Sequence, residues 1–425
     1  MKNAVAWKRL LDAEPAILAR LYPDPAAARE RYFRLIDRFA ALFGAEREFA
    51  LFSVPGRTEI GGNHTDHQRG RVLAAAVEPD MIAAAAPNGR PEIDLRSEGF
   101  SIPPVDLRTA DPSAPERGSS AALIRGVAAR LGALGFPIGG FDACMNSEVA
   151  AGSGLSSSAA FEVLIGEILS GLFCAGDIPP IVLAQAGQHA ENHYFGKPCG
   201  LMDQTACAVG GFALMDFSSP EAPAVRRISC DPAAFGYSLC IVDAGGSHQH
   251  LTEEYAAIPE EMRAVAGLFG AAVLGEVSSD AFYAAFPSLR GRISDRALLR
   301  AMHFFDENDR VLLQTRALET GNFPAFLNLV RASGDSSFTL LQNIYPVSSS
   351  QERSVALALA WCRRILRGSD GACRVHGGGF AGTIQAFVPL DRLPSFCRET
   401  DALFGPGRCR ALSVRQTGAV MLSST

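Results

Sequence analysis

The sequence predicts an α+β fold, in which helices and strands alternate irregularly along a chain of 425 residues. Segments with helical spacing of apolar residues and segments with short strand-like runs follow one another without the regular rhythm of βαβ units, which argues against a doubly wound parallel sheet. Hydrophobic residues make up 48% of the chain and charged residues 20%, values typical of a folded globular protein. At about 100–200 residues per domain, this length favours two or three domains.

The expected elements begin with helices. Between residues 4 and 44, apolar residues recur at mixed three- and four-residue spacing, which is typical of helices. Residues 50–54 have the composition of a strand, and the Pro55-Gly56 pair after them predicts a turn. Residues 101–118 contain four prolines and are expected to form a loop. Further along, we expect helices at 119–134, 156–172, 180–195, 251–270, 293–320, 323–333 and 350–367, strands at 141–149, 211–217 and 236–243, and a glycine-rich hairpin at 374–388.

Charge excludes several classes of partner. The chain has 39 basic and 45 acidic residues, a net charge of −6, without long runs of either sign. We therefore expect no binding to nucleic acid or to an anionic membrane surface. The only lysines are Lys2, Lys8 and Lys197, which leaves little room for chemistry that needs a lysine amine.

Cysteine usage and the absence of long apolar runs favour a cytoplasmic protein. The ten cysteines form no C-x-x-C pair and lie singly in apolar runs, as reduced core thiols do. The N-terminus has acidic residues too early for a signal peptide. The alanine-rich segment 72–86 is interrupted by Glu78 and Asp80, so we expect no membrane span there.

A glycine- and serine-rich segment, residues 152–160, lies between an expected strand and an expected helix. Glycines let the backbone approach an anion, serine hydroxyls add donors, and the following helix offers unpaired N–H groups and the positive end of its dipole. The segment lacks the Lys-Ser/Thr ending of a Walker A loop and the third glycine of a Rossmann fingerprint. It indicates either a phosphate-binding loop of another kind or a flexible loop capped by serine.

Residues 55–67 bring together an arginine, an amide, two imidazoles and two carboxylates. Such a density of polar side chains beside a strand indicates a ligand with many hydroxyl groups. A metal site formed by His64, Asp66 and His67 is an alternative, and a solvated polar loop is another.

Two further segments have an unusual composition. Asp203 is a carboxylate in an otherwise apolar stretch, just past a helix and a glycine, where a lone aspartate usually caps a helix. Residues 377–382 include four glycines inside a strand pattern. Glycines weaken a sheet, so this pattern is expected where another group must pass close to the backbone.

In their order and spacing, these four segments resemble the motifs of the GHMP small-molecule kinases, and within them the galactokinase family. Residues 55–67 are similar to the signature at the sugar site and 152–160 to the ATP loop. The segment around Asp203 is similar to the catalytic-aspartate motif, and 375–383 to the third, glycine-rich motif. The resemblance implies a two-lobed fold with the active site in the cleft between the lobes; we place an N-terminal lobe at 1–220 and a C-terminal lobe at 221–425.

The resemblance also implies an activity, ATP-dependent phosphorylation of galactose at the anomeric O1, with ATP and Mg²⁺ as cofactors. Asp203 would be the catalytic carboxylate and Arg57 its partner at the transferring phosphoryl group, while Ser158 and Glu191 would hold Mg²⁺. The other implied contacts are Asn63, His64, Thr65, Asp66, Gly200 and Tyr255 for the sugar, Ser97 near the nucleotide, and Gly152, Ser153, Gly154, Leu155, Ser156, Ser157 and Ser158 around the triphosphate. We expect a monomer whose partners are the sugar and ATP.

The role of the carboxylate stays open at this point. An aspartate is ionised at pH 7, and a neighbouring Arg57 would lower its pKa further, which makes Asp203 a weak base. It would either accept the proton late in the transfer or orient the sugar hydroxyl.

Some residues depart from the family pattern. The family usually has glutamate where this chain has Asn63 and tyrosine where it has His67, and Arg-Val-Asn-Leu-Ile-Gly is common where residues 57–62 read Arg-Thr-Glu-Ile-Gly-Gly. Asparagine donates as well as accepts hydrogen bonds, so the preference among sugars can shift. Lys197 is an extra cation six residues before Asp203, and a solvent-facing position is its plainest interpretation.

Three other functions remain as alternatives. A kinase of the same fold could act on N-acetylgalactosamine, a uronic acid or arabinose. A catalytically silent sugar sensor is a second alternative, although the presence of Arg57, Ser158, Glu191 and Asp203 argues against it. A metal-dependent hydrolase built on the two histidines is the third.

Overall fold

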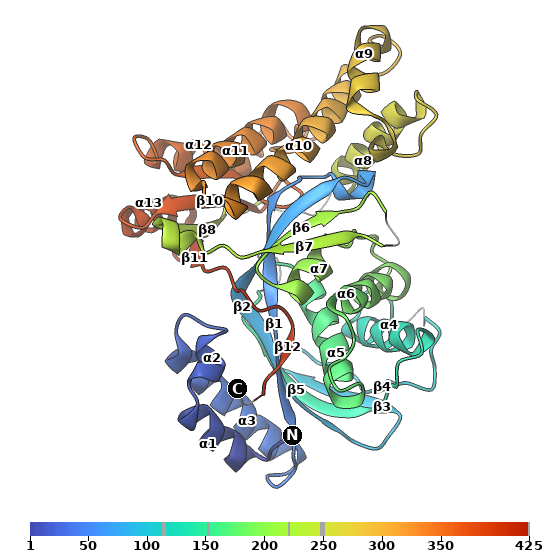
Figure 1. Cartoon of the computed structure of the whole chain (residues 1–425), viewed down its shortest axis with the longest axis vertical. Helices are drawn as coiled ribbons and strands as arrows, with labels where there is room; N and C mark the ends of the chain where they lie inside the picture. The colour runs from blue at the N-terminus through green and yellow to red at the C-terminus, as the bar shows by residue number, and fades with distance from the viewer. Residues whose placement is uncertain (113–115, 151–153, 220–221, 247–250, 424–425) are drawn as a thin grey trace.

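The computed structural model describes the chain except for residues 113–115, 151–153, 220–221, 247–250 and 424–425. Over the described residues it combines an eight-stranded and a four-stranded sheet with helices packed against both (Figure 1). The predicted α+β class is confirmed, and each predicted helix corresponds to a helix of the structure within a few residues.

Two long strands, β1 (Ala50–Gly61) and β2 (Arg71–Pro87), form the centre of the larger sheet. The strand order is β12-β1-β2-β5-β3-β4, with β6 paired to β2 and β7 to β6. β3 runs parallel to β5, whereas the other pairs of this sheet are antiparallel. The other strands are β3 (Glu92–Ser97), β4 (Val105–Asp106), β5 (Phe141–Ser147), β6 (Phe212–Asp216), β7 (Ala224–Ile228) and β12 (Val420–Met421).

Helices cover both faces of this sheet, which explains why its central strands are buried almost throughout. Successive side chains of a strand point to opposite faces. Leu51 and Ile82 therefore pack with the N-terminal helices, whereas Phe52 and Ala83 pack with the helices on the other face. The first group is α1 (Ala4–Ala13), α2 (Ala16–Ala19) and α3 (Pro25–Phe43); the second is α4 (Ser120–Ala133), α5 (Ser157–Phe173), α6 (Pro180–His189) and α7 (Met202–Val209), with a π-helical turn at Ala190–Phe195.

The smaller sheet, in the order β11-β8-β10-β9, lies with the later helices at the other end of the molecule (Figure 1). Helices α10 and α11 contact β1, which connects the two ends. The strands are β8 (Tyr237–Asp243), β9 (Ala372–Val375), β10 (Thr383–Pro389) and β11 (Cys409–Leu412); the helices are α8 (Thr252–Gly267), α9 (Ser279–Leu289), α10 (Asp295–Glu319), α11 (Phe323–Ser336), α12 (Ser354–Ile365) and α13 (Leu393–Phe404).

The predicted turn at Pro55-Gly56 is wrong, because β1 continues through both residues. The pairing register with β2 shifts between Pro55 and Gly56, and the strand accommodates both residues in this way. A Cβ at position 56 would lie 2.9 Å from the carbonyl oxygen of Leu155. The glycine therefore serves the close approach of the serine-rich segment to β1, not a reversal of the chain.

Several elements have no counterpart in the sequence prediction, above all β2. Its alanine-rich segment is a strand, in which Asp80 is buried and forms ion pairs with Arg31 and Arg415. In the part of the chain that the structure describes, no helix has the length and apolar character needed to cross a membrane.

The placement of a lobe boundary at residue 220 stays a prediction. The two sheets divide the chain near this position, although β7 follows it and belongs to the larger sheet. The C-terminal strand β12 also returns to the larger sheet, where it pairs with β1.

Candidate active site

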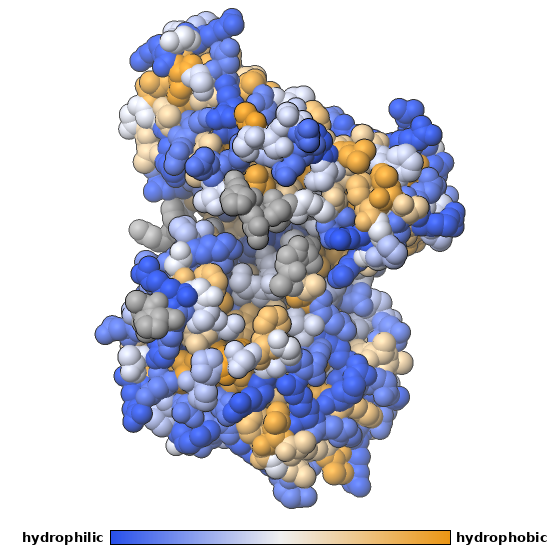
Figure 2. All heavy atoms as spheres, turned by 180° about the vertical axis from the view of Figure 1, so that it is seen from behind, coloured by the Kyte–Doolittle hydropathy of each residue, from blue (hydrophilic) through white to orange (hydrophobic). Residues whose placement is uncertain are grey.

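The four motifs meet at two adjoining cavities of about 260 and 310 Å³. We call them the histidine cavity and the serine cavity. The histidine cavity is lined by Arg57, Glu59, Asn63, His64, Asp66, His67, Cys199, Gly200, Met202, Asp203, Gly377 and Gly378. The serine cavity is lined by Arg57, Gly154, Ser156, Ser157, Ser158, Lys197, Asp203, His376, Gly377, Gly378, Gly379, Ala381, Gly382 and Thr383. Seen from behind, the surface is hollowed between the ends that contain the two sheets (Figure 2).

Asp203 and Arg57 form a two-pronged ion pair at the junction of the cavities. Arg57 donates from Nε to Asp203 Oδ1 at 2.7 Å and from Nη2 to Oδ2 at 2.6 Å. The Ser156 hydroxyl also donates to Oδ2, and Arg57 Nη1 donates to the Gly154 carbonyl at 2.6 Å. Burial raises the pKa of Asp203, but the arginine and the hydrogen bonds outweigh burial and hold that pKa below its usual value. The carboxylate is therefore ionised at neutral pH.

The serine-rich segment enters α5 through a left-handed residue. Ser156 has a φ of 58°, which is uncommon for a residue with a side chain and places its hydroxyl on Asp203. Ser157 and Ser158 form the first turn of α5, whose N-terminus faces the serine cavity. Leu155 is buried, and its carbonyl accepts a hydrogen bond from the backbone N–H of Arg57. Leu155 does not line the serine cavity. Gly152 and Ser153 lie outside the described residues.

Glu191 lies behind the serine cavity with several polar neighbours. Its Oε1 accepts from Ser158 Oγ at 3.3 Å and from Lys197 Nζ at 3.2 Å. Its Oε2 accepts from Gln204 Nε2 at 3.2 Å. Gln204 also donates to buried Glu162 at 2.9 Å, and burial together with Glu191 raises the pKa of Glu162 well above its usual value. Lys197 therefore pairs with Glu191 at the cavity, although its side chain is 64% exposed.

Hydrogen bonds define the proton positions of the two histidines. His64 Nε2 donates to the Gly378 carbonyl at 3.0 Å, since a carbonyl only accepts. Burial lowers the pKa of His64 to about 4, so the ring is neutral and its Nδ1 accepts from His67 Nε2 at 3.3 Å. His67 Nδ1 in turn accepts from Gln68. The two rings are thus bonded to each other, and over the described residues no three His, Cys, Asp or Glu side chains gather as a metal site.

Asp66 and Gly200 are in direct contact across the histidine cavity. A Cβ at position 200 would lie 2.1 Å from Asp66 Oδ2, so only glycine leaves this carboxylate in place. Burial raises the pKa of Asp66 above its usual value. Thr65 is fully buried, and its hydroxyl donates to the carbonyls of Gly62 and Arg71, so it shapes the loop behind the cavity.

Asn63 and Glu59 form one hydrogen-bonded unit in the wall of the histidine cavity. Asn63 Nδ2 donates to Glu59 Oε1 at 3.0 Å and to the Gly377 carbonyl at 2.7 Å. Arg374, which is fully buried, donates to the same Glu59 oxygen at 2.8 Å. Burial raises the pKa of Glu59 to about 7, although Arg374 and Arg57 act to lower it.

Tyr255 and Ser97, like Thr65 and Leu155, are predicted contact residues that lie outside the lining of both cavities. Tyr255 donates from its hydroxyl to the Gly379 carbonyl at 2.8 Å, and a Cβ on Gly378 would lie 2.7 Å from its ring. It therefore supports the glycine-rich loop from behind. Ser97 ends β3 beside Met145 of β5. Neither residue lines the described cavities.

The glycine-rich loop between β9 and β10 faces the serine-rich segment. A Cβ on Gly154 would lie 2.8 Å from Thr383 Oγ1 and 3.0 Å from His376 Nδ1. Gly379 has a φ of 84°, and a Cβ there would lie 2.1 Å from the Asn343 carbonyl oxygen. A side chain on Gly154 would push the two segments apart, and one on Gly379 would displace the loop from Asn343, which accounts for these two glycines.

Sequence reasoning assigned no role to Glu59, Arg374 or His376. Glu59 lies two residues after Arg57 on β1 and therefore shares its face of the strand. The period of two would have indicated this neighbour, but the predicted turn at Pro55-Gly56 ended the strand too early. Arg374 and His376 lie just before the glycines, where no local pattern marks them as partners of β1 residues.

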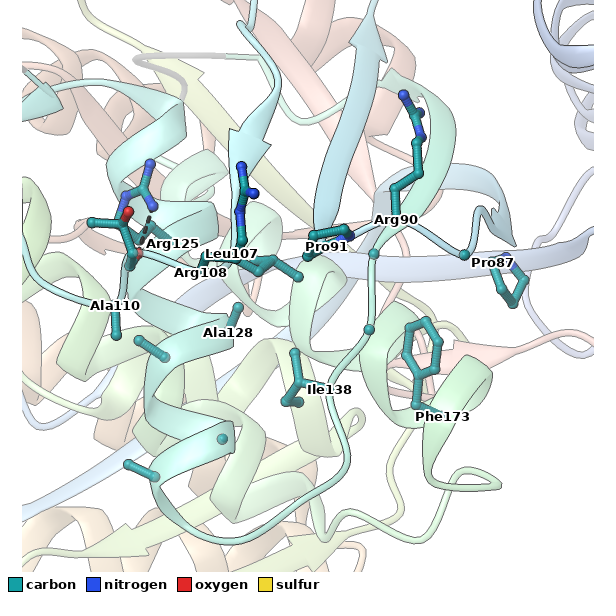
Figure 3. Close-up of a pocket in the computed structure, with 17 residues that line it drawn as sticks. Pro87, Arg90, Pro91, Leu107, Arg108, Ala110, Arg125, Ala128, Ile138 and Phe173 are labelled. Atoms are coloured by element: carbon teal, nitrogen blue, oxygen red, sulfur yellow. Dashed lines mark hydrogen bonds between the residues drawn. The ribbon is translucent and has the colours of Figure 1, made fainter.

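A larger cavity, of about 690 Å³, lies away from these motifs, beside the C-terminal parts of α4 and α5 (Figure 3). Its lining includes the apolar side chains of Leu107, Ile138 and Phe173. Its arginines are already paired with carboxylates; for example, Arg125 binds both oxygens of Glu116 at 2.8 Å. We assign this cavity no part in the chemistry.

Comparisons with known proteins agree with the motifs. Residues 37–87 match the model of the galactokinase galactose-binding signature, and residues 118–211 match the model of the GHMP kinases N-terminal domain. Galactokinase from Streptomyces coelicolor is 32% identical over 380 residues, which cover 88% of this chain and 93% of that protein. Galactokinase from Lactococcus lactis is 28% identical over 85% of this chain and 88% of the relative.

Solved structures show the same fold. The crystal structure of Lactococcus lactis galactokinase complexed with galactose matches with a TM-score of 0.77 and 24% identity, over 92% of this chain and all of that chain. Methanococcus jannaschii mevalonate kinase matches with a TM-score of 0.60 and 15% identity, over 86% and 98% of the two chains. Because the Streptomyces relative is 32% identical and matches nearly end to end, the chain belongs to the galactokinase family of the GHMP kinases.

Proposed function

We propose that the chain transfers the γ-phosphoryl group of ATP to O1 of galactose, giving galactose 1-phosphate and ADP. The observation that carries the proposal is the Arg57–Asp203 ion pair shared by the two cavities. One cavity offers carboxylates and imidazoles suited to a sugar. The other offers a helix N-terminus with serine hydroxyls suited to phosphates. A group transferred between the two ligands would pass this pair.

Asp203 acts on the sugar hydroxyl as an orienting group and a weak base. Its lowered pKa means that it takes the proton only as the O–P bond forms, when the hydroxyl has become strongly acidic. The hydrogen bonds from Arg57 and Ser156 hold the carboxylate in one orientation. Arg57 stabilises the negative charge that spreads over the transferring phosphoryl group.

The residues around Glu191 fit a magnesium ion, which we propose as the cofactor. Glu191 and Ser158 supply a carboxylate and a hydroxyl oxygen 3.3 Å apart, the hard donors that Mg²⁺ prefers. Mg²⁺ in kinases usually takes few protein ligands, because phosphate oxygens and water complete its shell. When bound, the ion neutralises phosphate charge. The Lys197 ammonium lies 3.2 Å from the same Glu191 oxygen and adds positive charge at the cavity.

Two variants test the metal ligands. Glu191→Gln should raise the Mg²⁺ concentration for half-maximal turnover at least about tenfold, since a hard cation loses a charged ligand. Ser158→Ala removes a neutral ligand and should cause a smaller shift. Glu30→Gln, an exposed carboxylate on α3, is the control and should leave the titration unchanged. Binding of Mn²⁺ with ATP, followed by electron paramagnetic resonance, checks the effect without turnover. Unchanged titrations in both site variants would place the metal elsewhere.

The activity itself is tested by ADP release in the presence of galactose. We expect ADP to appear only with sugar, and nuclear magnetic resonance of the product to show phosphate on the anomeric oxygen. A panel with N-acetylgalactosamine, galacturonic acid and arabinose measures the preference. Equal or higher kcat/KM on one of these sugars would remove galactose as the preferred substrate. Sugar binding without ADP release would identify a sensor instead.

We also propose that one chain is the active unit, because residues of a single chain line both cavities. Sedimentation at the protein concentration used for the assay should give the mass of a monomer. A dimer mass, with activity lost on dilution, would contradict this.

A further inference from the structure

We infer that Glu59, and not Asn63, is the residue of the histidine-cavity wall that accepts a hydrogen bond from a sugar hydroxyl and so contributes to sugar selection. The inference rests on the proposed function, because it assigns the sugar to this cavity. It follows from which hydrogen-bonding positions of Asn63 and Glu59 are already occupied by other residues of the protein.

Asn63 has no hydrogen-bonding position left for a ligand. A carboxamide has two N–H donors and two acceptor lone pairs. Both donors are used, on Glu59 Oε1 and on the Gly377 carbonyl. Since these two partners only accept, the amide orientation is defined. Both lone pairs of Oδ1 are used as well, by Asn343 Nδ2 at 2.7 Å and Ser337 Oγ at 3.3 Å. The residue is 1% exposed.

Glu59 has one oxygen used by the protein and one open. Oε1 accepts from both Arg374 and Asn63, which holds the carboxyl group in place. Oε2 accepts no hydrogen bond from any described residue. It is also absent from the buried side-chain atoms that lack a partner, so this oxygen is accessible to solvent. The side chain keeps 6% exposure and lines the histidine cavity. An acceptor oxygen therefore reaches the cavity from a rigidly held group.

The position of Glu59 on β1 indicates which part of the sugar it meets. Residues 57 and 59 share one face of the strand and are spaced by about 7 Å. Arg57 marks the phosphoryl end of the site, where the anomeric oxygen reacts. Glu59 then lies toward the side of the ring remote from the anomeric carbon, where the hydroxyls at C3, C4 and C6 are.

Arg374 explains why the carboxylate is at this position. Its guanidinium is fully buried, and Glu59 is the carboxylate that pairs with it, at 2.8 Å. A buried arginine needs a charged partner. At pH values above the Glu59 pKa of about 7, the wall thus offers a charged acceptor at position 59 and a neutral, fully bonded amide at position 63.

Monodeoxy sugars combined with variants test the contact. For wild type and Glu59→Gln, kcat/KM is measured at about pH 8.5, where a carboxyl with a pKa of about 7 is ionised, on galactose and on its 3-, 4- and 6-deoxy forms. Glutamine can keep the bonds of Oε1 but turns the open oxygen into a donor. We expect one deoxy sugar to lose about 10- to 100-fold in wild type, as for a hydrogen bond to a charged group. The same deletion should cost Glu59→Gln less than about threefold, because the contact is already lost.

Two further variants serve as controls. Glu59→Asp keeps the charge beside Arg374 but withdraws the open oxygen by one methylene, and it should show the same reduced response to the deoxy sugar. Asn63→Ala should keep most of the wild-type discrimination. Thermal melting identifies variants that do not fold.

Equal losses in wild type and in the folded Glu59 variants would overturn the inference, as would discrimination lost only in Asn63→Ala. Failure of wild type to phosphorylate galactose would contradict the proposed function instead. The two failures are therefore distinguishable.

Discussion

Replacing Asp203 by alanine should lower kcat by about 10²–10⁴-fold, the usual contribution of a positioned acid–base group, and leave the affinities for ATP and sugar nearly unchanged. The carboxylate lies at the junction of the cavities, with both oxygens held by Arg57 and Ser156. An interaction made mainly in the transition state appears in kcat and not in binding. Rapid-quench measurement of a single turnover, together with calorimetric titration of both ligands, checks the two parts.

A matched control removes a similar ion pair elsewhere. Asp216 of β6 accepts from Arg71 Nε at 2.7 Å, and its side chain is 24% exposed, against 31% for Asp203. Asp216→Ala should keep kcat within about twofold of wild type, because the pair does not line either cavity. If Asp203→Ala retained a tenth of the wild-type kcat, Asp203 would not be the catalytic carboxylate.

The second large effect concerns stability: replacing Asp80 by alanine should destabilise the fold by about 3–5 kcal/mol. Asp80 is fully buried on β2 and binds Arg31 at 2.5 Å and Arg415 at 2.8 Å. It also accepts from Tyr22 at 2.5 Å and from Ser53. Without the carboxylate, two arginines with almost no solvent contact lose their shared negative partner. Urea unfolding followed by circular dichroism measures the change.

Lys8 and Asp37 provide the comparison, since this pair is exposed. Their side chains are 33% and 65% accessible, and the two atoms lie 2.6 Å apart. Asp37→Ala should cost less than about 1 kcal/mol, as exposed ion pairs do. Similar losses of unfolding free energy in Asp37→Ala and Asp80→Ala would contradict the prediction that the buried ion pairs of Asp80 stabilise the fold more than an exposed pair does.

The contribution of Asp80 should also depend on pH. Burial raises the pKa of Asp80, but Arg31 and Arg415 outweigh burial and lower that pKa below its usual value. A lowered pKa in the folded state stabilises the fold at pH values above the unfolded pKa of about 3.9. This stability is lost as the pH falls through the folded pKa. The difference between wild type and Asp80→Ala should therefore shrink in acid and remain constant from pH 5 to 8.

Local sequence predicted most of the helices, although not α7, α9 and α13, because apolar spacing, capping residues and prolines act within a few residues. Asp24 shows this: its side chain accepts from the N–H groups of Ala26 and Ala27, and Pro25 opens α3. The four motifs were recognisable for a related reason, since each is a short run whose residue types suit one task. The resemblance of these motifs to the family implied that Arg57 and Asp203, 146 residues apart, are partners, and the ion pair between them is present.

The tertiary structure alone decided how the side chains of the site are used. Asn63 and Glu59 are close in sequence, and either could face a ligand. The partners that occupy Asn63 and hold Glu59 lie 280 and 315 residues further along the chain, at Asn343 and Arg374. A residue type defines how many hydrogen bonds a side chain can make. Only the packing of distant segments decides which of those bonds the protein uses and which remain for a ligand.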